Sequence, residues 1–201
     1  MGAENIAFSR LIARLPAMPA NAVADAHLTR IARQIVRDGA RVIGFLTVTG
    51  RRDPVDLTPL LQRIAQSVTG FVEQRDVAVI PTWGEWKPIP GGTPEMEAAA
   101  PRMTVREVQP RVVEVLPAAK SDATSAGMAL GEVLKVLSDD FAHVLVNLDG
   151  YAPAGGRAPS AVALVEAVAL VVSRRRARLK DVGLLVEHIP TSKHLGAVLL
   201  G

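Results

Sequence analysis

A chain of 201 residues suits one domain of ordinary size, and because 49% of its residues are hydrophobic but only 3% aromatic, its core must be built from Ala, Val, Leu and Ile. Such a core is typical of helices packed on a parallel sheet whose strands are buried on both faces. The absence of cysteine excludes disulfides and thiolate metal sites and fits a reducing cytoplasm, while a formal net charge of +3 is too small to indicate nucleic acid as a partner.

The N-terminal part of the chain predicts a leader, a helix and a buried strand. Residues 1–22 are expected to form a flexible leader, because Pro16 and Pro19 prevent a long helix. From Val23 the apolar residues recur every three or four positions, which predicts an amphipathic helix. The apolar stripe of this helix consists of Ala24, Leu28, Ile31, Ala32 and Ile35. The apolar run Val42–Val48 then has the length of a strand.

The middle of the chain continues this alternation and then interrupts it. Apolar spacing predicts a second amphipathic helix over Leu57–Val68, and the apolar run Val77–Ile80 predicts a buried strand. Residues 81–110 are rich in Pro and Gly, so we expect an irregular excursion there. A strand is expected to resume over Val112–Leu116.

The C-terminal part predicts further alternating elements. They are a helix over Ala126–Leu137, a strand over Val144–Val146, a strand over Ala167–Val172, a helix over Leu179–Ile189 and a strand over Ala197–Leu200. Because strands alternate with helices, the pattern favours right-handed crossovers and a doubly wound, mostly parallel α/β sheet with helices on both faces. Ligands of such sheets bind beyond the carboxyl ends of the strands. We expect one domain of this kind over residues 23–201.

The order of these elements and several local sequences are similar to those of a known family. The segments Ala167-Val-Ala-Leu-Val-Val-Ser-Arg174, Leu195-Gly-Ala-Val-Leu-Leu-Gly201 and Phe141-Ala-His-Val-Leu-Val-Asn-Leu-Asp149 resemble the last strands and the Walker B strand of bacterial tyrosine autokinases. These kinases belong to the P-loop group that also includes the septum-site and chromosome-partitioning ATPases. The resemblance covers roughly residues 23–201 and implies a P-loop NTPase-like fold.

The loop that should bind phosphate lacks the required residue types. A P-loop needs glycines that let backbone N–H groups surround the phosphates, a Lys for their charge and a Ser or Thr for Mg²⁺. If Gly50 is the first glycine of the pattern, Val55 stands at the second glycine, Asp56 at the lysine and Leu57 at the Mg²⁺ hydroxyl. A shift in register does not help, because no lysine precedes Trp86.

The remaining polar residues of this loop have simpler interpretations. Asp56 directly precedes the second predicted helix, so we expect it to act as an N-cap at the positive helix end, where phosphate would otherwise bind. Arg51 and Arg52 are compatible with anion binding, but a solvated turn is the favoured interpretation. The four arginines within Arg174–Arg178 lack interleaved aromatic residues and are also interpreted as a solvated loop.

The acidic positions of the family pattern are altered too. Asn147 stands at the Walker B position, and an amide is a poor Mg²⁺ ligand beside a carboxylate. Asp149 follows in an Asp-Gly pair, where a turn former is favoured over a metal ligand. Tyr151 is the only tyrosine of the sequence, so we do not expect the tyrosine-rich tail that these kinases phosphorylate. We therefore expect a vestigial loop with no catalytic residues, no metal and no nucleotide cofactor.

Two surfaces are candidates for binding a partner protein. The kinases associate through an N-terminal helix that carries Glu-x-x-Arg-x-x-Arg, and here Arg30 and Arg33 remain while His27 replaces the acid. A homo-oligomer and a plain solvated face are both open for this helix. Trp83 and Trp86 follow the second strand, and Trp and Arg are enriched at interface hot spots. Coverage of the sheet edge is the alternative role for both tryptophans.

The resemblance implies a catalytically degenerate kinase-like protein in exopolysaccharide or capsule biosynthesis and export. Its expected partner is an inner-membrane polysaccharide co-polymerase or chain-length protein. The longest apolar stretch, Ala161–Val172, contains Glu166 and is shorter than the roughly 20 residues that a membrane span needs, so we expect a cytoplasmic protein that reaches the inner membrane through its partner. The alternative is a partitioning or polar-localisation protein of the same superfamily, and an NTPase with an unconventional site ranks last.

Overall fold

Apart from two strands, β1 and β4, the strands and helices follow one another in the order that the apolar pattern predicts. The computed structural model describes residues 12–15, 22–48, 56–82, 103–117, 123–149, 160–173 and 177–200. The strands are β1 (Ile12–Leu15), β2 (Val42–Val48), β3 (Val77–Ile80), β4 (Met103–Gln109), β5 (Val112–Pro117), β6 (His143–Asn147), β7 (Ala167–Ser173) and β8 (His194–Leu200). The helices are α1 (Ala22–Asp38), α2 (Thr58–Thr69), α3 (Ala123–Asp140) and α4 (Leu179–His188), with short 3-10 helices η4 (Ser160–Leu164) and η5 (Thr191–Lys193).

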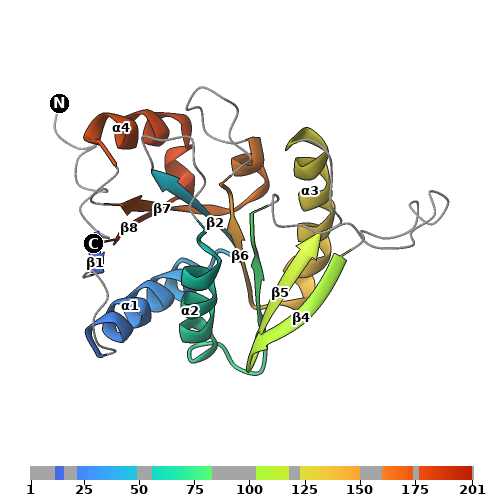
Figure 1. Ribbon diagram of the computed structural model, residues 1–201. Coiled ribbons are helices and arrows are strands. Elements are labelled where there is room, and N and C mark those ends of the chain that lie inside the picture. Colours follow the sequence, from blue (N-terminus) through green and yellow to red (C-terminus); the bar gives the residue numbers. More distant parts are fainter. Residues whose placement is uncertain are drawn as a thin grey trace.

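The described strands form one sheet in the order β1-β8-β7-β2-β6-β3-β5-β4. Every neighbouring pair is parallel except β4 and β5, which form an antiparallel hairpin. β2 lies between β7 and β6, so the chain that leaves β2 crosses β6 to reach β3, and β6 is later followed by β7 on the other side of β2 (Figure 1). The predicted doubly wound, mostly parallel α/β fold is therefore confirmed.

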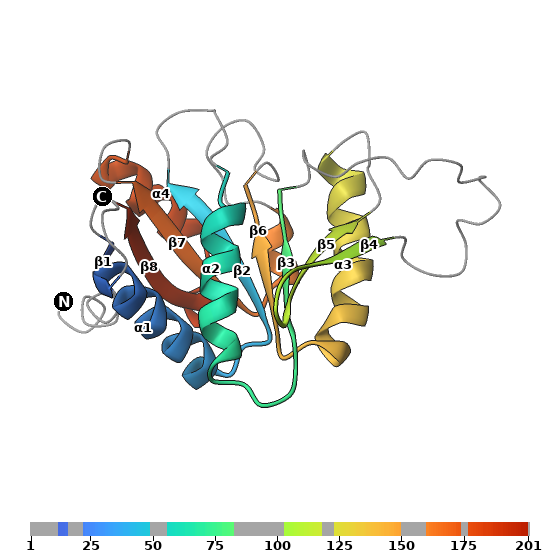
Figure 2. The same cartoon turned by 60° about the horizontal axis from the view of Figure 1, so that its bottom comes forward.

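Two helical layers cover the sheet. Buried residues of α1 and α2 pack on one face in a cluster that includes Phe45 and Leu145 of the sheet. α3 and the inner side of α4 pack on the other face, in a cluster that includes Leu46 and Val146 (Figure 2). Because successive residues of β2 and β6 enter opposite clusters, these strands are buried on both faces, as their continuous apolar runs predict. None of the described helices is long and apolar enough to cross a membrane.

Part of the expected leader is a strand. Ile12–Leu15 forms β1 and pairs in parallel with β8, with Ile12 opposite Ala197. The prediction of a leader over residues 1–22 is therefore wrong for these four residues. The prolines exclude a long helix, but they do not exclude a short strand, and β8 offers it unpaired backbone groups at the sheet edge. The rest of this segment up to residue 21 lies outside the described residues.

Part of the expected excursion over residues 81–110 is regular as well. Met103–Gln109 forms β4, which a turn at Pro110 and Arg111 joins to β5. The turn places Arg111 in the left-handed region, with φ of 64°. β4 escaped prediction because its central residues 104–107 are exposed on both faces of the strand, so no alternation marks them. Residues 83–102 lie outside the described residues.

Candidate functional site

Polar side chains gather where β2, β6 and β3 end side by side. Thr47 is the penultimate residue of β2, Asn147 is the last residue of β6, and Thr82 lies two residues beyond β3. Asp149 follows β6 in a turn. The carboxyl edge of a doubly wound sheet is the place where ligands bind, so this cluster is the candidate functional site.

Asp149 binds β2 through both oxygens of its carboxylate. Its Oδ1 accepts a hydrogen bond from the backbone N–H of Thr47 at 2.9 Å, and its Oδ2 accepts one from the Thr47 hydroxyl at 2.6 Å. The residue is only 5% exposed, which makes these charge-assisted bonds strong and their loss costly. Asp149 does lie in a turn, as predicted, but its side chain has the further task of joining two strands.

The backbone of Asp149 extends the connection to β3 and β6. Its carbonyl oxygen accepts a hydrogen bond from the Thr82 hydroxyl at 2.5 Å, and its N–H donates to Asn147 Oδ1 at 3.0 Å. Thr82 and Asn147 are both buried. These contacts, together with those of Thr47, form one hydrogen-bonded cluster that links the carboxyl ends of the neighbouring strands β2, β6 and β3.

Asn147 contributes a buried amide at the end of β6. Its side chain is fully buried, and its Oδ1 is occupied by the N–H of Asp149. Its Nδ2 has no hydrogen-bond partner among the described residues. A buried amide with its oxygen already engaged adds neither negative charge nor a free oxygen for a divalent cation. Within the part of the chain that the structure describes, no group of three or more His, Asp or Glu side chains could hold a metal ion.

Asp56 caps α2, one position earlier than predicted. The helix begins at Thr58 and Leu57 occupies the N-cap position, so Asp56 stands just outside the helix. Asp56 Oδ1 accepts a hydrogen bond from the Thr58 N–H at 2.8 Å. The carboxylate thus satisfies an amide at the positive helix end, as expected from its sequence position. Gly50, Arg51 and Arg52 lie outside the described residues.

The candidate partner-binding arginines lie on the exposed side of α1. Arg30 and Arg33 are both exposed, but the Arg33 guanidinium stands 5.5 Å from the centre of the Phe71 ring, just beyond α2. This cation–π contact joins α1 to the segment after α2, so Arg33 also has a role within the fold. Trp83 and Trp86 lie outside the described residues.

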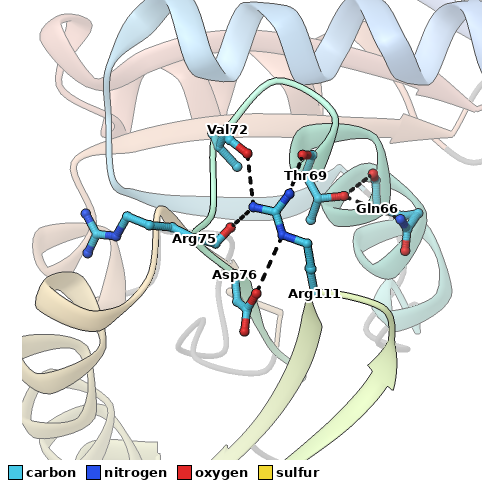
Figure 3. Close-up of polar contacts among 6 residues, drawn as sticks. All are labelled: Gln66, Thr69, Val72, Arg75, Asp76 and Arg111. Atoms are coloured by element: carbon cyan, nitrogen blue, oxygen red, sulfur yellow. Dashed lines mark hydrogen bonds and ion pairs between the residues drawn. The ribbon is translucent and has the colours of Figure 1, made fainter.

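Arg111 is a structurally important residue that sequence reasoning missed. Its guanidinium donates to the carbonyl oxygens of Thr69 at 3.1 Å, Val72 at 3.0 Å and Arg75 at 2.5 Å (Figure 3). Its Nε lies 3.7 Å from Asp76 Oδ1. The side chain therefore holds the C-terminal end of α2 and the loop to β3 together through their carbonyl oxygens. This region lies at the end of the sheet opposite the hydrogen-bonded cluster around Asp149. A lone arginine in a turn carries no sequence signal for this role.

Comparison with known proteins finds solved structures of similar fold but no relative in sequence. No family model matches the chain, and no curated protein matches it in sequence. A solved structure titled "BceF Tyrosine Kinase Domain" is similar with a TM-score of 0.59 and 13% identity, covering 89% of this chain and 78% of that one. The chimerical protein CapA2B2 is similar with a TM-score of 0.59 and 12% identity, covering 90% of this chain and 86% of that one.

The chain shares the α/β fold of these two solved structures. The likeness covers 89% and 90% of this chain. At these levels of identity it establishes the fold and not the activity.

Proposed function

We propose that this protein is a non-catalytic, tyrosine-kinase-like partner in the biosynthesis and export of a surface polysaccharide. The proposed absence of catalysis is supported first by the bonding of Asp149, whose two carboxylate oxygens both accept hydrogen bonds from Thr47. A carboxylate used in this way holds the protein together at the place where a kinase would hold Mg²⁺ and phosphate.

The neighbouring residues support the same conclusion. Asn147 replaces an acid, Asp56 caps the helix that would receive phosphate, and the sequence before Trp86 contains no lysine. Phosphoryl transfer depends on positioned cations around the phosphates, and these positions offer amide and acidic groups instead. A protein that retains the scaffold without these groups is most simply a binding or regulatory subunit.

The proposed partner is the cytoplasmic end of an inner-membrane polysaccharide co-polymerase. This part of the proposal rests on the family resemblance of the sequence and is supported by the likeness to a tyrosine kinase domain. The proposed contact surfaces are Arg30 and Arg33 on α1, and Trp83 and Trp86 after β3. Association of copies through α1 is part of the same proposal, and the protein would remain cytoplasmic and reach the membrane through its partner.

Deletion of the gene tests the proposed function. We expect loss or altered length of the surface polymer, and restoration by the unaltered protein. Complementation with Arg30→Glu/Arg33→Glu, and separately with Trp83→Ala/Trp86→Ala, is expected to fail. Lys135→Glu is the control, because it reverses an exposed charge on α3, which packs on the opposite face of the sheet from α1.

The outcomes separate the function from its surfaces. Normal polymer in the deletion strain would exclude the polysaccharide role, and mislocalised polar or division machinery in that strain would favour the partitioning alternative. If the deletion has a polymer defect but both variants complement it, the proposed contact surfaces are wrong and the function stands.

A further inference from the structure

β4 is an end strand of the sheet and has one open side. Its inner side pairs with β5, and no described strand pairs with its outer side, which lies at the margin of the sheet (Figure 1, Figure 2). Backbone N–H and C=O groups on the open side of an end strand can pair with a further strand. The central residues 104–107 are exposed, and Val105, a β-branched residue suited to strand pairing, is 49% exposed. β4 therefore offers an edge on which an extended segment can pair.

The features that normally protect an end strand are weak over most of β4. Such strands are commonly blocked by charged side chains, proline or β-bulges. The irregularity of β4 lies between Glu107 and Gln109, so Met103–Glu107 remains a regular run without proline. Arg106 Nη2 lies 2.9 Å from Glu114 Oε1 on β5, so its charge is paired within the sheet. Most of the edge is thus available for pairing.

The regular run Met103–Glu107 is complementary to itself in one register. In an isologous antiparallel pair, a two-fold axis normal to the sheet places one residue opposite its own copy. With the axis at Val105 the whole run pairs, and Met103 stands opposite Glu107, and Thr104 opposite Arg106, of the second copy. No like charges face each other in this register, and the exposed β-branched side chains of Val105 meet at its centre.

The neighbouring registers are less favourable. With the axis at Arg106 or at Glu107, that charged residue stands directly opposite its own copy, and like charges across a strand pair are destabilising. With the axis at Thr104, Arg106 and Glu107 extend past the end of the paired run. Charge and strand regularity therefore select the same register.

We propose that β4 is a self-association edge, on which a second copy of this chain pairs its own β4 in antiparallel orientation about a two-fold axis at Val105. The eight-stranded sheet continues through both molecules in this dimer. A short pair of strands buries little surface, so the dimer is weak and forms at high protein concentration. This inference is independent of the proposed role in polysaccharide export, and it uses a different element from the proposed association through α1.

Disulfide trapping of the full chain tests the register, because the sequence contains no cysteine. Residues opposite each other in an antiparallel pair have Cα atoms about 4.5 to 5.5 Å apart, which a disulfide can span. Under mild oxidation, Val105→Cys should form a covalent dimer at least about tenfold faster than Met128→Cys, whose side chain is exposed on α3. Glu107→Cys should also be slow, because its copy lies farther along the paired strand.

Exchange of charge at the axis gives an independent measurement. In sedimentation equilibrium, the mass of the unaltered protein should rise with concentration from 21.3 kDa towards twice that value. Val105→Lys and Val105→Glu each place like charges opposite each other, so each alone should dimerise at least about tenfold more weakly. An equal mixture of the two should regain the dimer, because opposite charges then meet at the axis. This recovery also shows that both variants are folded.

Matched substitutions on α3 are the control. Met128→Lys and Met128→Glu make the same changes in charge at an exposed apolar residue. Alone and mixed, they should dimerise as the unaltered protein does.

Three results would overturn the proposal. One is a rate of disulfide formation in Val105→Cys no faster than in Met128→Cys. The second is a mass that stays at 21.3 kDa at the highest concentration the protein reaches in solution. The third is a dimer of unchanged strength in Val105→Lys, which would place self-association on another surface, with α1 as the alternative.

Discussion

Thr47 and Asp149 are joined twice, because the carboxylate of Asp149 accepts both the backbone N–H and the hydroxyl of Thr47. The two residues are 102 positions apart in the sequence, and they connect the ends of adjacent strands β2 and β6. The contact makes the acid at this edge a part of the framework of the fold.

Substitution of Asp149 should therefore lower stability. We expect Asp149→Asn to reduce the free energy of unfolding by about 2 kcal/mol, because charge-assisted bonds to a buried group are lost. Thr47→Val removes only the hydroxyl donor and should cost about 1 kcal/mol. Urea unfolding of both single variants and the double variant measures the coupling between the two side chains. Strictly additive losses would contradict the paired arrangement.

Nucleotide should leave stability unchanged. A ligand that binds only the native state adds RT ln(1 + [L]/Kd), which is about 2.7 kcal/mol at a hundredfold excess over Kd. Thermal melts with and without millimolar Mg·ATP are expected to coincide. An upward shift that disappears in Arg51→Ala/Arg52→Ala would reveal a working phosphate site and would contradict the non-catalytic proposal.

Arg111 should be more important for stability than its position in a turn suggests. Arg111→Ala removes donors from three carbonyl oxygens, and we expect a loss of about 2 kcal/mol in the free energy of unfolding. Arg111→Gly loses the same bonds but relieves the left-handed backbone, so it should be less destabilising than the alanine variant. Equal stability of the alanine variant and the unaltered protein in urea would show that solvent replaces these bonds.

His143 should make the protein less stable in mildly acidic solution. Burial lowers the pKa of this side chain, against the opposing effects of its hydrogen bond with the Ala40 carbonyl and of Glu166, while Arg41 and Arg75 lower it further. The unfolded state therefore binds a proton near pH 6.5 that the folded state resists. Stability contributed by His143 is complete above this pH and falls as the pH drops from 6.5 towards the lower folded pKa.

Unfolding at a series of pH values checks this sign. In His143→Gln the contribution of this side chain should vanish, so the loss of stability below pH 6.5 becomes shallower by up to about 1.4 kcal/mol per pH unit. Met128→Gln, at an exposed position of α3, changes no ionisable group and should keep the slope of the unaltered protein. A steeper fall in the His143 variant would reverse the assignment.

The central strands could be predicted from the sequence because a strand that is buried on both faces is a continuous run of apolar residues. Val42–Val48 and Val77–Ile80 are continuous apolar runs, and the structure gives both strands these bounds. β1 and β4 lack such an apolar run, since β1 is defined by its distant partner β8 and the centre of β4 is exposed on both faces. Edge strands depend on pairing more than on composition.

The same distinction applies to the candidate site. The change to Asn147 and the capping by Asp56 can be expected from neighbouring residues, and Asp56 was misplaced by one position only. The hydrogen bonds between Thr47 and Asp149 could not be expected from the sequence. An Asp-Gly pair indicates a turn and does not indicate a contact with a hydroxyl on another strand.

The pairing of β1 with β8 also has a consequence for how the chain folds as it is synthesised. Ile12 is made before its partner Ala197, and the chain between them contains every other described strand except β8 itself. The inner strands β2, β3, β5 and β6 can associate before that, since all of them precede β7 and β8 in the chain. Contacts between such distant segments form slowly, because a long loop must close first. β1 is thus made before the strand that holds it, and its backbone groups wait for β8 while the strands between them associate.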